Sequence, residues 1–154
     1  MLTLHVPALD ELWFRQQMLA DPVTMAYNRA WGGTIPFPEE RWASWYSLWI
    51  AHGGKDRFYR YLREGNGDFV GEVAYHFDDE TGGAMADVIV FSGYRGRGYG
   101  SRGLEMLCAA AKENGVAVLY DDIAADNPAI GMFLRHGFAE ERRTAEKIWL
   151  KKTL

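Results

Sequence analysis

The sequence has one cysteine and no long apolar run, and these two shortages exclude several classes of protein. Cys108 alone cannot form an internal disulfide or a cysteine-rich metal site, and we expect it to be a small buried hydrophobe on a helix. No stretch approaches the roughly 20 apolar residues of a membrane span. The first residues also lack the basic start and apolar core of a secretory signal. We therefore expect a cytoplasmic protein with no membrane partner and no metal.

Basic residues are also fewer than acidic residues in this chain. The chain carries 17 basic and 21 acidic residues, for a formal net charge of −4. This balance gives no electrostatic footprint for nucleic acid, and it favours a cationic partner such as an amine or a basic peptide. The length of 154 residues fits a single domain, 1–154.

The N-terminal third is predicted to hold a short strand at 3–6 and a helix at 9–20. Apolar side chains recur in this helix at helical spacing. They predict one buried face made of Leu9, Leu12, Trp13 and Leu19. The pair Asp21-Pro22 ends the helix, because proline cannot continue it.

A second helix is expected to begin at Pro38, because proline suits the first helical position, and to end at Gly53-Gly54. Aromatic residues recur along it at i, i+3, i+4 and i+7, which predicts a stripe packed on the core. The stripe consists of Trp42, Trp45, Tyr46 and Trp49. Trp31, in the Gly- and Pro-rich loop 31–38, is instead a candidate wall for a pocket that takes a cationic amine.

The period of the apolar pattern changes in the middle of the chain. Short turns separate predicted strands at 58–62, 69–77 and 86–91, which indicates an antiparallel meander. A helix at 98–114 follows, and Gly115 is placed to end it in a left-handed turn. A strand at 116–123 is then expected to lie parallel to 86–91 through a right-handed crossover.

The last part of the chain is predicted to hold a short helix and two strands. The helix covers 127–135, with Asn127 (or Asp126) as its cap, Pro128 at its first position and Gly137 as its stop. The first of the two strands begins at Phe138, and the second covers 147–151. The predicted fold class is α+β: an antiparallel meander that leads into one parallel β-α-β unit.

The loop Arg95–Gly100 lies between the strand at 86–91 and the helix that follows, and its composition suits an anion. The first turn of a helix leaves backbone N–H groups unpaired, and glycines let a phosphate approach them. Arg95 and Arg97 add donors for phosphate oxygens. Two alternatives are a plain turn and a Rossmann loop, which would need a third glycine where Ser101 stands.

Two stretches together resemble the signatures of the GNAT acetyltransferase superfamily. One is Arg95–Gly100 after an apolar strand, and the other runs from Asn127 through a short helix to Gly137-Phe138. The resemblance is clear over residues 84–140. It implies a central, mostly antiparallel twisted sheet with helices on both faces, in which the parallel strands splay apart to bind an acyl-CoA.

The resemblance also implies binding roles. The backbone of strand 86–91 would pair with the pantetheine arm, the glycine loop would hold the pyrophosphate, and the cofactor would be acetyl-CoA or another acyl-CoA. The residues implied in cofactor binding are Ile89, Val90, Phe91, Arg95, Gly96, Arg97, Gly98, Tyr99, Gly100, Ser101, Asn127 and Phe133. Many members dimerise, so a homodimer is compatible with the resemblance.

Direct attack of an amine on a thioester sets three chemical needs. The amine must lose a proton, since alkyl amines have pKa values near ~10; the developing oxyanion needs a donor; and the leaving thiolate takes up a proton. The family's usual proton donor is a tyrosine in the slot that Phe133 fills here, and Phe133 also fits a plain core role. Tyr120 is a candidate replacement, and Asn127 could contact the arm or the acceptor.

Carboxylates inside predicted strands are the candidate bases, because a strand suited to the core holds an acid only at a cost. Asp87 interrupts strand 86–91, and Asp121 and Asp122 interrupt strand 116–123. Adjacent strand residues point to opposite faces, so only one of that pair can face the cleft. Glu72 and His76 are further candidates, and a salt bridge at the rim is the alternative for each acid.

The sequence thus predicts an N-acyltransferase that moves an acetyl group from acetyl-CoA to an amine of a small molecule or peptide. A CoA-binding sensor module without catalysis is the alternative that Phe133 keeps open. A dinucleotide-binding domain is the third reading of the glycine loop.

Overall fold

A computed structural model describes residues 1–154 and contains one seven-stranded sheet in the order β1-β2-β3-β4-β5-β7-β6. The strands are β1 (Thr3–His5), β2 (Arg57–Arg63), β3 (Phe69–Asp78), β4 (Gly83–Val90), β5 (Val118–Ala124), β6 (Ala139–Arg143) and β7 (Lys147–Thr153). Every neighbouring pair is antiparallel except β4 and β5, which are parallel. The predicted α+β class and its single parallel unit are confirmed.

Helices cover both faces of the sheet. The α-helices are α1 (Trp13–Ala20), α2 (Trp42–Tyr46), α3 (Tyr99–Glu113) and α4 (Ile130–Arg135). Short 3-10 helices are η1 (Leu9–Glu11), η2 (Thr24–Trp31), η3 (Glu39–Arg41) and η5 (Ser92–Tyr94), and α2 continues into one π-helical turn, η4 (Ser47–Ala51). No helix is long and apolar enough to cross a membrane.

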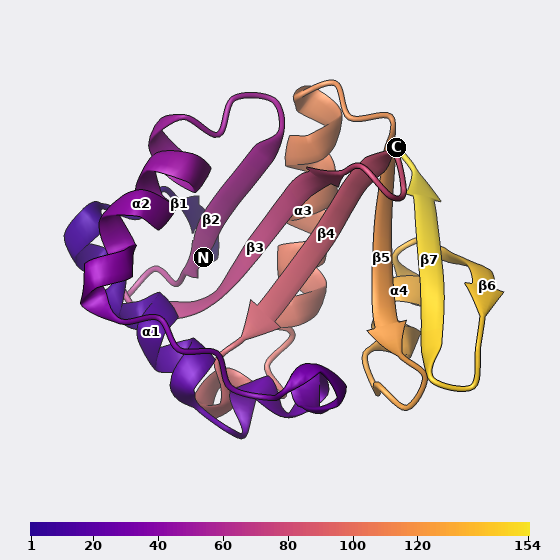
Figure 1. Cartoon of the computed structure of the whole chain (residues 1–154), viewed down its shortest axis with the longest axis horizontal. Coiled ribbons are helices and arrows are strands. Elements are labelled where there is room, and N and C mark those ends of the chain that lie inside the picture. Colours follow the sequence, from indigo (N-terminus) through magenta and orange to yellow (C-terminus); the bar gives the residue numbers. More distant parts are fainter.

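The alternation of side chains along the strands produces two cores, one on each face. On β4, Ala84 and Ala86 belong to the core that α3 covers, and Cys108 is buried there as expected. Ile89 belongs to the opposite core, which α1 and η2 cover. The aromatic stripe of the second helix packs against this opposite core, as predicted. Figure 1 shows α3 behind the sheet and α1 and α2 on the other side.

The two parallel strands stay together only at one end. β4 and β5 pair at Ala84 with Leu119 and at Met85 with Tyr120, and their register ends there. Beyond these pairs the strands diverge toward their carboxyl ends and form a V (Figure 1). The sheet is therefore split from about Asp87 onward, and the helix that joins the strands, α3, begins beside the open end.

Two expectations for the N-terminal third need correction. Leu9 and Trp13 are 44% and 48% exposed, so these two residues do not belong to the predicted buried face of the helix at 9–20, whereas Leu12 and Leu19 are buried as predicted. The helix opens with the tighter 3-10 turn η1, which rotates the residues that follow, and Phe14 and Met18 are buried with Leu12 and Leu19. No helix was expected between Asp21-Pro22 and the loop at 31–38, where the structure has η2, an eight-residue 3-10 helix that lies next to β5.

Candidate active site

The glycine loop presents a row of free backbone donors at the open end of the V. The amides of residues 96–101 donate no hydrogen bond within the protein, and the first backbone donor of the helix is Arg102, which bonds to Gly98 O. Gly96 and Gly98 have φ of 78° and 80°, and a Cβ at either position would meet nothing within 4 Å. The loop surface is thus open, and positive φ at both positions is accessible to glycine at little cost.

The two arginines of the loop have different surroundings. Arg95 donates to the carbonyl oxygens of Val23 and Thr24, at 3.2 and 2.8 Å, and so anchors the start of η2. Arg97 is exposed, and its guanidinium carbon lies 5.6 Å from the ring centroid of Tyr94. Arg97 is therefore the free cation beside the row of amides, while Arg95 connects the loop to the N-terminal region.

The first turn of α3 packs against both walls of the V. A Cβ on Gly100 would lie 3.2 Å from Met132 Sδ of α4 and 3.6 Å from Val90 Cγ2 of β4. Ser101 Oγ is hydrogen-bonded to His136 Nε2, just after α4. These contacts hold the unpaired amides in place between the two walls.

The backbone of β4 that the resemblance assigns to the pantetheine arm has one free edge. Ile89 and Val90 pair with Glu72 and Gly71 of β3, and the Phe91 amide donates to Val70 O. No register with β5 exists at these residues. Ile89, Val90 and Phe91 can therefore add a strand-like partner on the side that faces the split.

Asp87 lies where β4 and β5 begin to diverge. Its side chain reaches solvent, but the surrounding walls exclude much of the water, and this enclosure raises the pKa of Asp87. Arg15 and His76 act in the opposite direction. Asp121 on the facing strand has its pKa raised by burial first and then by the charges of Asp87 and Asp122. Neither Asp87 nor Asp121 is in a salt bridge.

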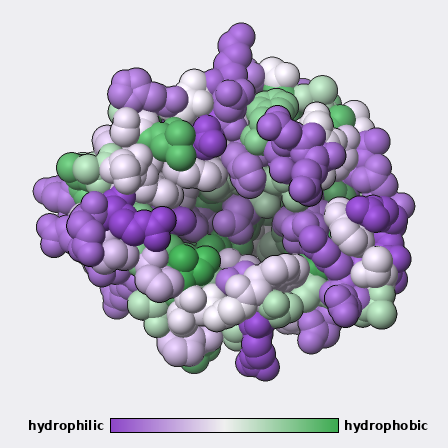
Figure 2. Space-filling model, viewed as in Figure 1, coloured by the Kyte–Doolittle hydropathy of each residue, from purple (hydrophilic) through white to green (hydrophobic).

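Tyr27 of η2 lies close enough to these carboxylates for their charges to affect its pKa. Burial raises its pKa, and the charges of Asp87, Glu72 and Asp121 add to this effect. The front of the molecule is hollowed at the place where the two strands diverge (Figure 2). Asp87, Asp121 and Tyr27 are thus coupled to one another electrostatically at this split.

A buried ion pair lies beside Asp87 on the same face of the sheet. Arg15 of α1 donates to both carboxylate oxygens of Glu72, at 2.9 and 2.8 Å, and Tyr59 OH donates to the same carboxylate. The guanidinium also lies 4.6 Å from the ring centroid of Trp45. Glu72 is 1% exposed, and burial raises its pKa to about 7 although Arg15 favours the charged form. Glu72 is therefore committed to a structural pair.

Asp122 and Tyr120 lie on β5 next to the split. Asp122 Oδ2 accepts from Lys147 Nζ at 2.6 Å, so this carboxylate already has a cation. Tyr120 stands at the closed end of the V, and its ring fills the space above Gly83, where a Cβ would approach Tyr120 Cε2 to 2.2 Å. The structure thus leaves Asp87 unpaired and gives Asp122 a partner.

Asn127 and Phe133 carry the second signature. The Asn127 side-chain oxygen accepts from the Ala129 amide at 2.9 Å in the turn before α4, but α4 begins at Ile130 with Ala129 as its N-cap and no side-chain cap. The predicted helix start at Asn127, with Asn127 as cap and Pro128 at the first position, is therefore wrong. Phe133 is 3% exposed and packs edge-to-face on Phe138, so its core role is confirmed. Their contacts with a cofactor stay predictions.

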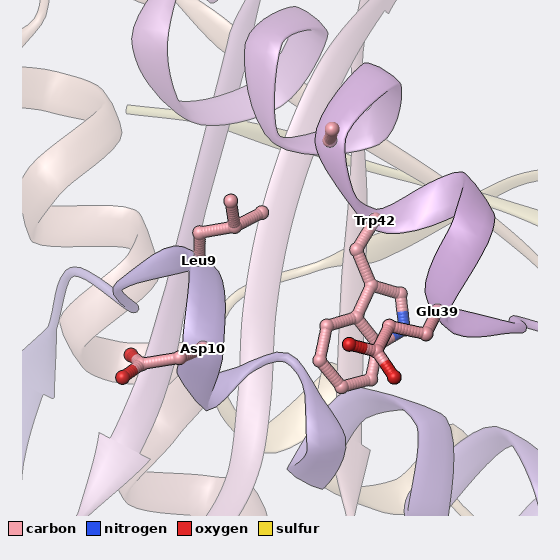
Figure 3. A pocket seen from close by; sticks show the side chains of 5 residues that line it. Leu9, Asp10, Glu39 and Trp42 are labelled. Carbon is pink, nitrogen blue, oxygen red and sulfur yellow. The ribbon is translucent and has the colours of Figure 1, made fainter.

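Two further hollows lie outside the split. One, of about 500 Å³, separates Leu9 and Asp10 on one side from Glu39 and Trp42 on the other (Figure 3). The second, of about 340 Å³, lies between α1 and the ends of β3 and β4, with Trp13, Phe91 and Tyr94 in its lining. Neither contains the glycine loop or the acids of the split.

Sequence reasoning missed several residues of the site. Arg15, Tyr27 and Lys147 come from segments far apart in the chain, and no local motif marks them. No local sequence motif could indicate the role of Arg15, because its partner Glu72 lies 57 residues away in the sequence. Trp31 was singled out, and it lies on η2 within cation–π distance of Lys147 on the other side of the split.

Comparisons with known proteins agree with this arrangement. Residues 21–138 match the model of the acetyltransferase (GNAT) family, whereas no curated protein matches the sequence. The solved N-acetyltransferase of Staphylococcus aureus Mu50 superposes with a TM-score of 0.80 at 16% identity, covering 99% of this chain and 98% of that one. The mostly antiparallel sheet and the family match exclude the Rossmann reading of the glycine loop.

Two other solved structures are similar in fold. The ribosomal-protein-alanine N-acetyltransferase of Brucella melitensis has a TM-score of 0.78 at 23% identity, covering 100% of this chain and 99% of that one. The spermidine N-acetyltransferase of Vibrio cholerae, solved with CoA and spermine, has a TM-score of 0.79 at 17% identity, covering 99% and 95%. At these identities the likeness concerns the fold.

Proposed function

Because the chain belongs to the acetyltransferase (GNAT) family, we propose that it transfers an acetyl group from acetyl-CoA to a primary amine of a small molecule or peptide. The observation that carries the proposal is the split between β4 and β5, with free amides at its mouth and an unpaired carboxylate at its apex.

The residues at the split fit acetyl-CoA. Six consecutive amides, at residues 96–101, and the positive end of α3 would take the pyrophosphate, with Arg97 as the neighbouring cation. The free edge of β4 at Ile89–Phe91 would pair with the amide groups of the pantetheine arm. When bound, acetyl-CoA supplies an activated acetyl thioester at the apex of the V.

Asp87 is the base in this proposal. An alkyl amine with a pKa near ~10 arrives as a cation and must lose one proton before its lone pair can attack. Enclosure raises the pKa of Asp87 and brings the proton affinities of the two groups closer, which helps the transfer. Asp122 is less suited to the task because Lys147 neutralises it.

The leaving thiolate takes up one proton, and Phe133 has no proton to give. A thiol pKa near ~8.5 makes the need for a donor modest, so solvent in the open hollow suffices. The overall reaction converts an ammonium and a thioester into an acetamide, a thiol and one released proton. Tyr120, at the closed end of the V, remains the protein group that could donate.

The test is CoA release from acetyl-CoA with a panel of amines, measured on the wild type and on Asp87→Asn. We expect the substitution to lower kcat by a factor of about 10²–10⁴ while acetyl-CoA still binds. Asp79→Asn, in the exposed turn before β4, removes the same charge and is the control. Unchanged kcat in Asp87→Asn would reject Asp87 as the base.

A second outcome would reject catalysis itself. If acetyl-CoA binds but no amine of the panel releases CoA, the chain is a CoA-binding sensor module. The core position of Phe133 in the tyrosine slot is the feature that would then explain the loss.

A further inference from the structure

Aromatic rings line the hollow between α1 and the ends of β3 and β4. Its volume of about 340 Å³ falls within the range of small-molecule pockets, roughly 300–1,000 Å³. None of its lining residues is basic, and Asp68 is the only charged one. The aromatic lining residues are Trp13, Phe14, Phe69, Phe91 and Tyr94. We call these five rings together with Asp68 the aromatic cage.

The rings of the aromatic cage follow one another around the hollow. The ring centroid of Trp13 lies 5.9 Å from that of Phe14, which lies 5.8 Å from that of Phe91. Phe91 in turn lies 6.4 Å from Tyr94, whose hydroxyl donates to Asp68 Oδ2 at 3.4 Å. The residue after Asp68 is the fifth ring, and it lies 6.1 Å from Trp13. The wall is therefore a closed circuit in which each member supports the next.

The aromatic cage has a buried base and an open rim. Phe14 is 2% exposed, whereas Trp13, the first residue of α1, is 48% exposed. A large aromatic side chain left in water beside a hollow is apolar surface that a ligand can cover. Covering that surface is favourable, because it removes apolar area from water.

Asp68 gives the aromatic cage a negative charge without a cationic partner. None of the salt bridges of the protein includes Asp68. Its two side-chain donors, Asn66 Nδ2 and the Tyr94 hydroxyl, are neutral, and both bind Oδ2. A cation that enters the hollow would meet this carboxylate at one side and ring faces on the others.

The polar groups of the aromatic cage are too few for a primary ammonium. Such an ion has three N–H donors, and each needs an acceptor once it leaves water. A quaternary ammonium has no N–H, and its methyl groups carry the positive charge onto the faces of aromatic rings. Aromatic rings with one carboxylate therefore favour a trimethylammonium group.

We propose that the aromatic cage is a binding site for the quaternary ammonium group of a small ligand, separate from the split between β4 and β5. A quaternary nitrogen has no lone pair and cannot be acetylated, so this ligand is not the amine acceptor. Phe91 takes part in both places, since its backbone lies at the edge of the split and its ring lines the aromatic cage.

The test is a set of binding titrations followed by ligand-observed NMR, which measures weak binding. Choline is the probe, and neohexyl alcohol, in which carbon replaces the quaternary nitrogen, has the same shape without the charge. Ethanolamine is the primary-ammonium counterpart. The variants are Trp13→Ala, Trp13→Phe and Asp68→Asn. The matched controls are Trp31→Ala, which removes a tryptophan that is 51% exposed outside the cage, and Asp79→Asn, in an exposed turn.

We expect choline to bind the wild type about tenfold more tightly than either analogue. Trp13→Ala should weaken choline about tenfold and Asp68→Asn severalfold, while Trp13→Phe retains most of the affinity and both controls stay within about twofold. Neohexyl alcohol binding as tightly as choline would reduce the cage to a plain apolar hollow. No binding of choline, or equal affinity in Trp13→Ala, would also overturn the proposal.

The proposed function and this site fail separately. Choline affinity that is lost in Asp87→Asn and kept in Trp13→Ala would place the ligand in the split and reject the aromatic cage. Choline binding that depends on Trp13 and Asp68 supports the aromatic cage even if no amine releases CoA. The site is thus tested without any measurement of acetyl transfer.

Discussion

The buried pair of Arg15 and Glu72 predicts a stability defect that depends on pH. Arg15→Met keeps much of the apolar contact with Phe37, Trp45 and Tyr59 but leaves Glu72 buried without its cation. Removing one partner of a buried ion pair costs about 3–5 kcal/mol of unfolding free energy. Glu72 limits this cost by staying protonated and neutral, and protonation becomes more costly as the pH rises. The loss of unfolding free energy in Arg15→Met therefore increases with pH.

The sign follows from the pKa of Glu72, which burial raises to about 7 from 4.5. Because Glu72 has a higher pKa in the folded than in the unfolded protein, its proton binding stabilises the folded state. This contribution is complete below the pKa of Glu72 in the unfolded protein and is lost as the pH rises through its pKa in the folded protein. In the wild type the loss amounts to about 3 kcal/mol and ends near pH 7. Without Arg15 the pKa of Glu72 rises further, so the variant continues to lose about 1.4 kcal/mol per pH unit.

Urea unfolding at about pH 6 and about pH 8 measures both effects. The difference between Arg15→Met and the wild type should grow between these two values. The double variant Arg15→Met/Glu72→Gln should recover most of the loss and show no extra pH dependence, because no buried charge remains. A defect that is the same at both pH values, or a double variant as unstable as Arg15→Met, would refute this reasoning.

Three further substitutions test how the site is supported. Gly103→Ala places a Cβ 2.8 Å from Leu62 Cδ1, and urea unfolding should show a loss of about 1–3 kcal/mol from overpacking. Thr24→Val removes the acceptor of the Ser92 amide and a donor to Asp21, and it should cost about 1–3 kcal/mol and loosen η2, as measured by amide exchange. In Gly83→Ala the new Cβ displaces the Tyr120 ring, which a Cβ would approach to 2.2 Å. We expect this substitution to change kcat if Tyr120 takes part in the reaction, and to lower only the stability if it does not.

The parts of the fold that could be predicted from the sequence are those with local causes. Turn residues and strand patterns placed the meander β2-β3-β4, and glycines at 115 and 137 ended their helices with φ of 84° and 89°. The loop Arg95–Gly100 was recognisable because unpaired amides at a helix start and glycine φ angles are local properties. The resemblance then supplied the split between β4 and β5.

The parts that could not be predicted depend on distant pairs. The roles of Arg15 and Lys147 depend on partners that lie 57 and 25 residues away in the sequence. Helix and strand patterns extend over much shorter stretches, so they cannot reveal such pairs. The 3-10 helix η2 was not predicted, and its place beside β5 follows only from tertiary contacts. The choice between Asp87 and Asp122 likewise required the salt bridge that engages Asp122.

The central claim is that the split between β4 and β5 binds acetyl-CoA through the glycine loop. The most direct measurement is the thermal shift of the purified protein with acetyl-CoA, CoA and NADH, compared among the wild type, Arg97→Ala and Arg41→Ala, an exposed arginine in η3. A ligand at 100 times its Kd adds roughly 2.7 kcal/mol, or several degrees for a domain of this size. The account predicts shifts with acetyl-CoA and CoA that fall in Arg97→Ala and persist in Arg41→Ala. No shift with either ligand, or a shift with NADH alone, would contradict it.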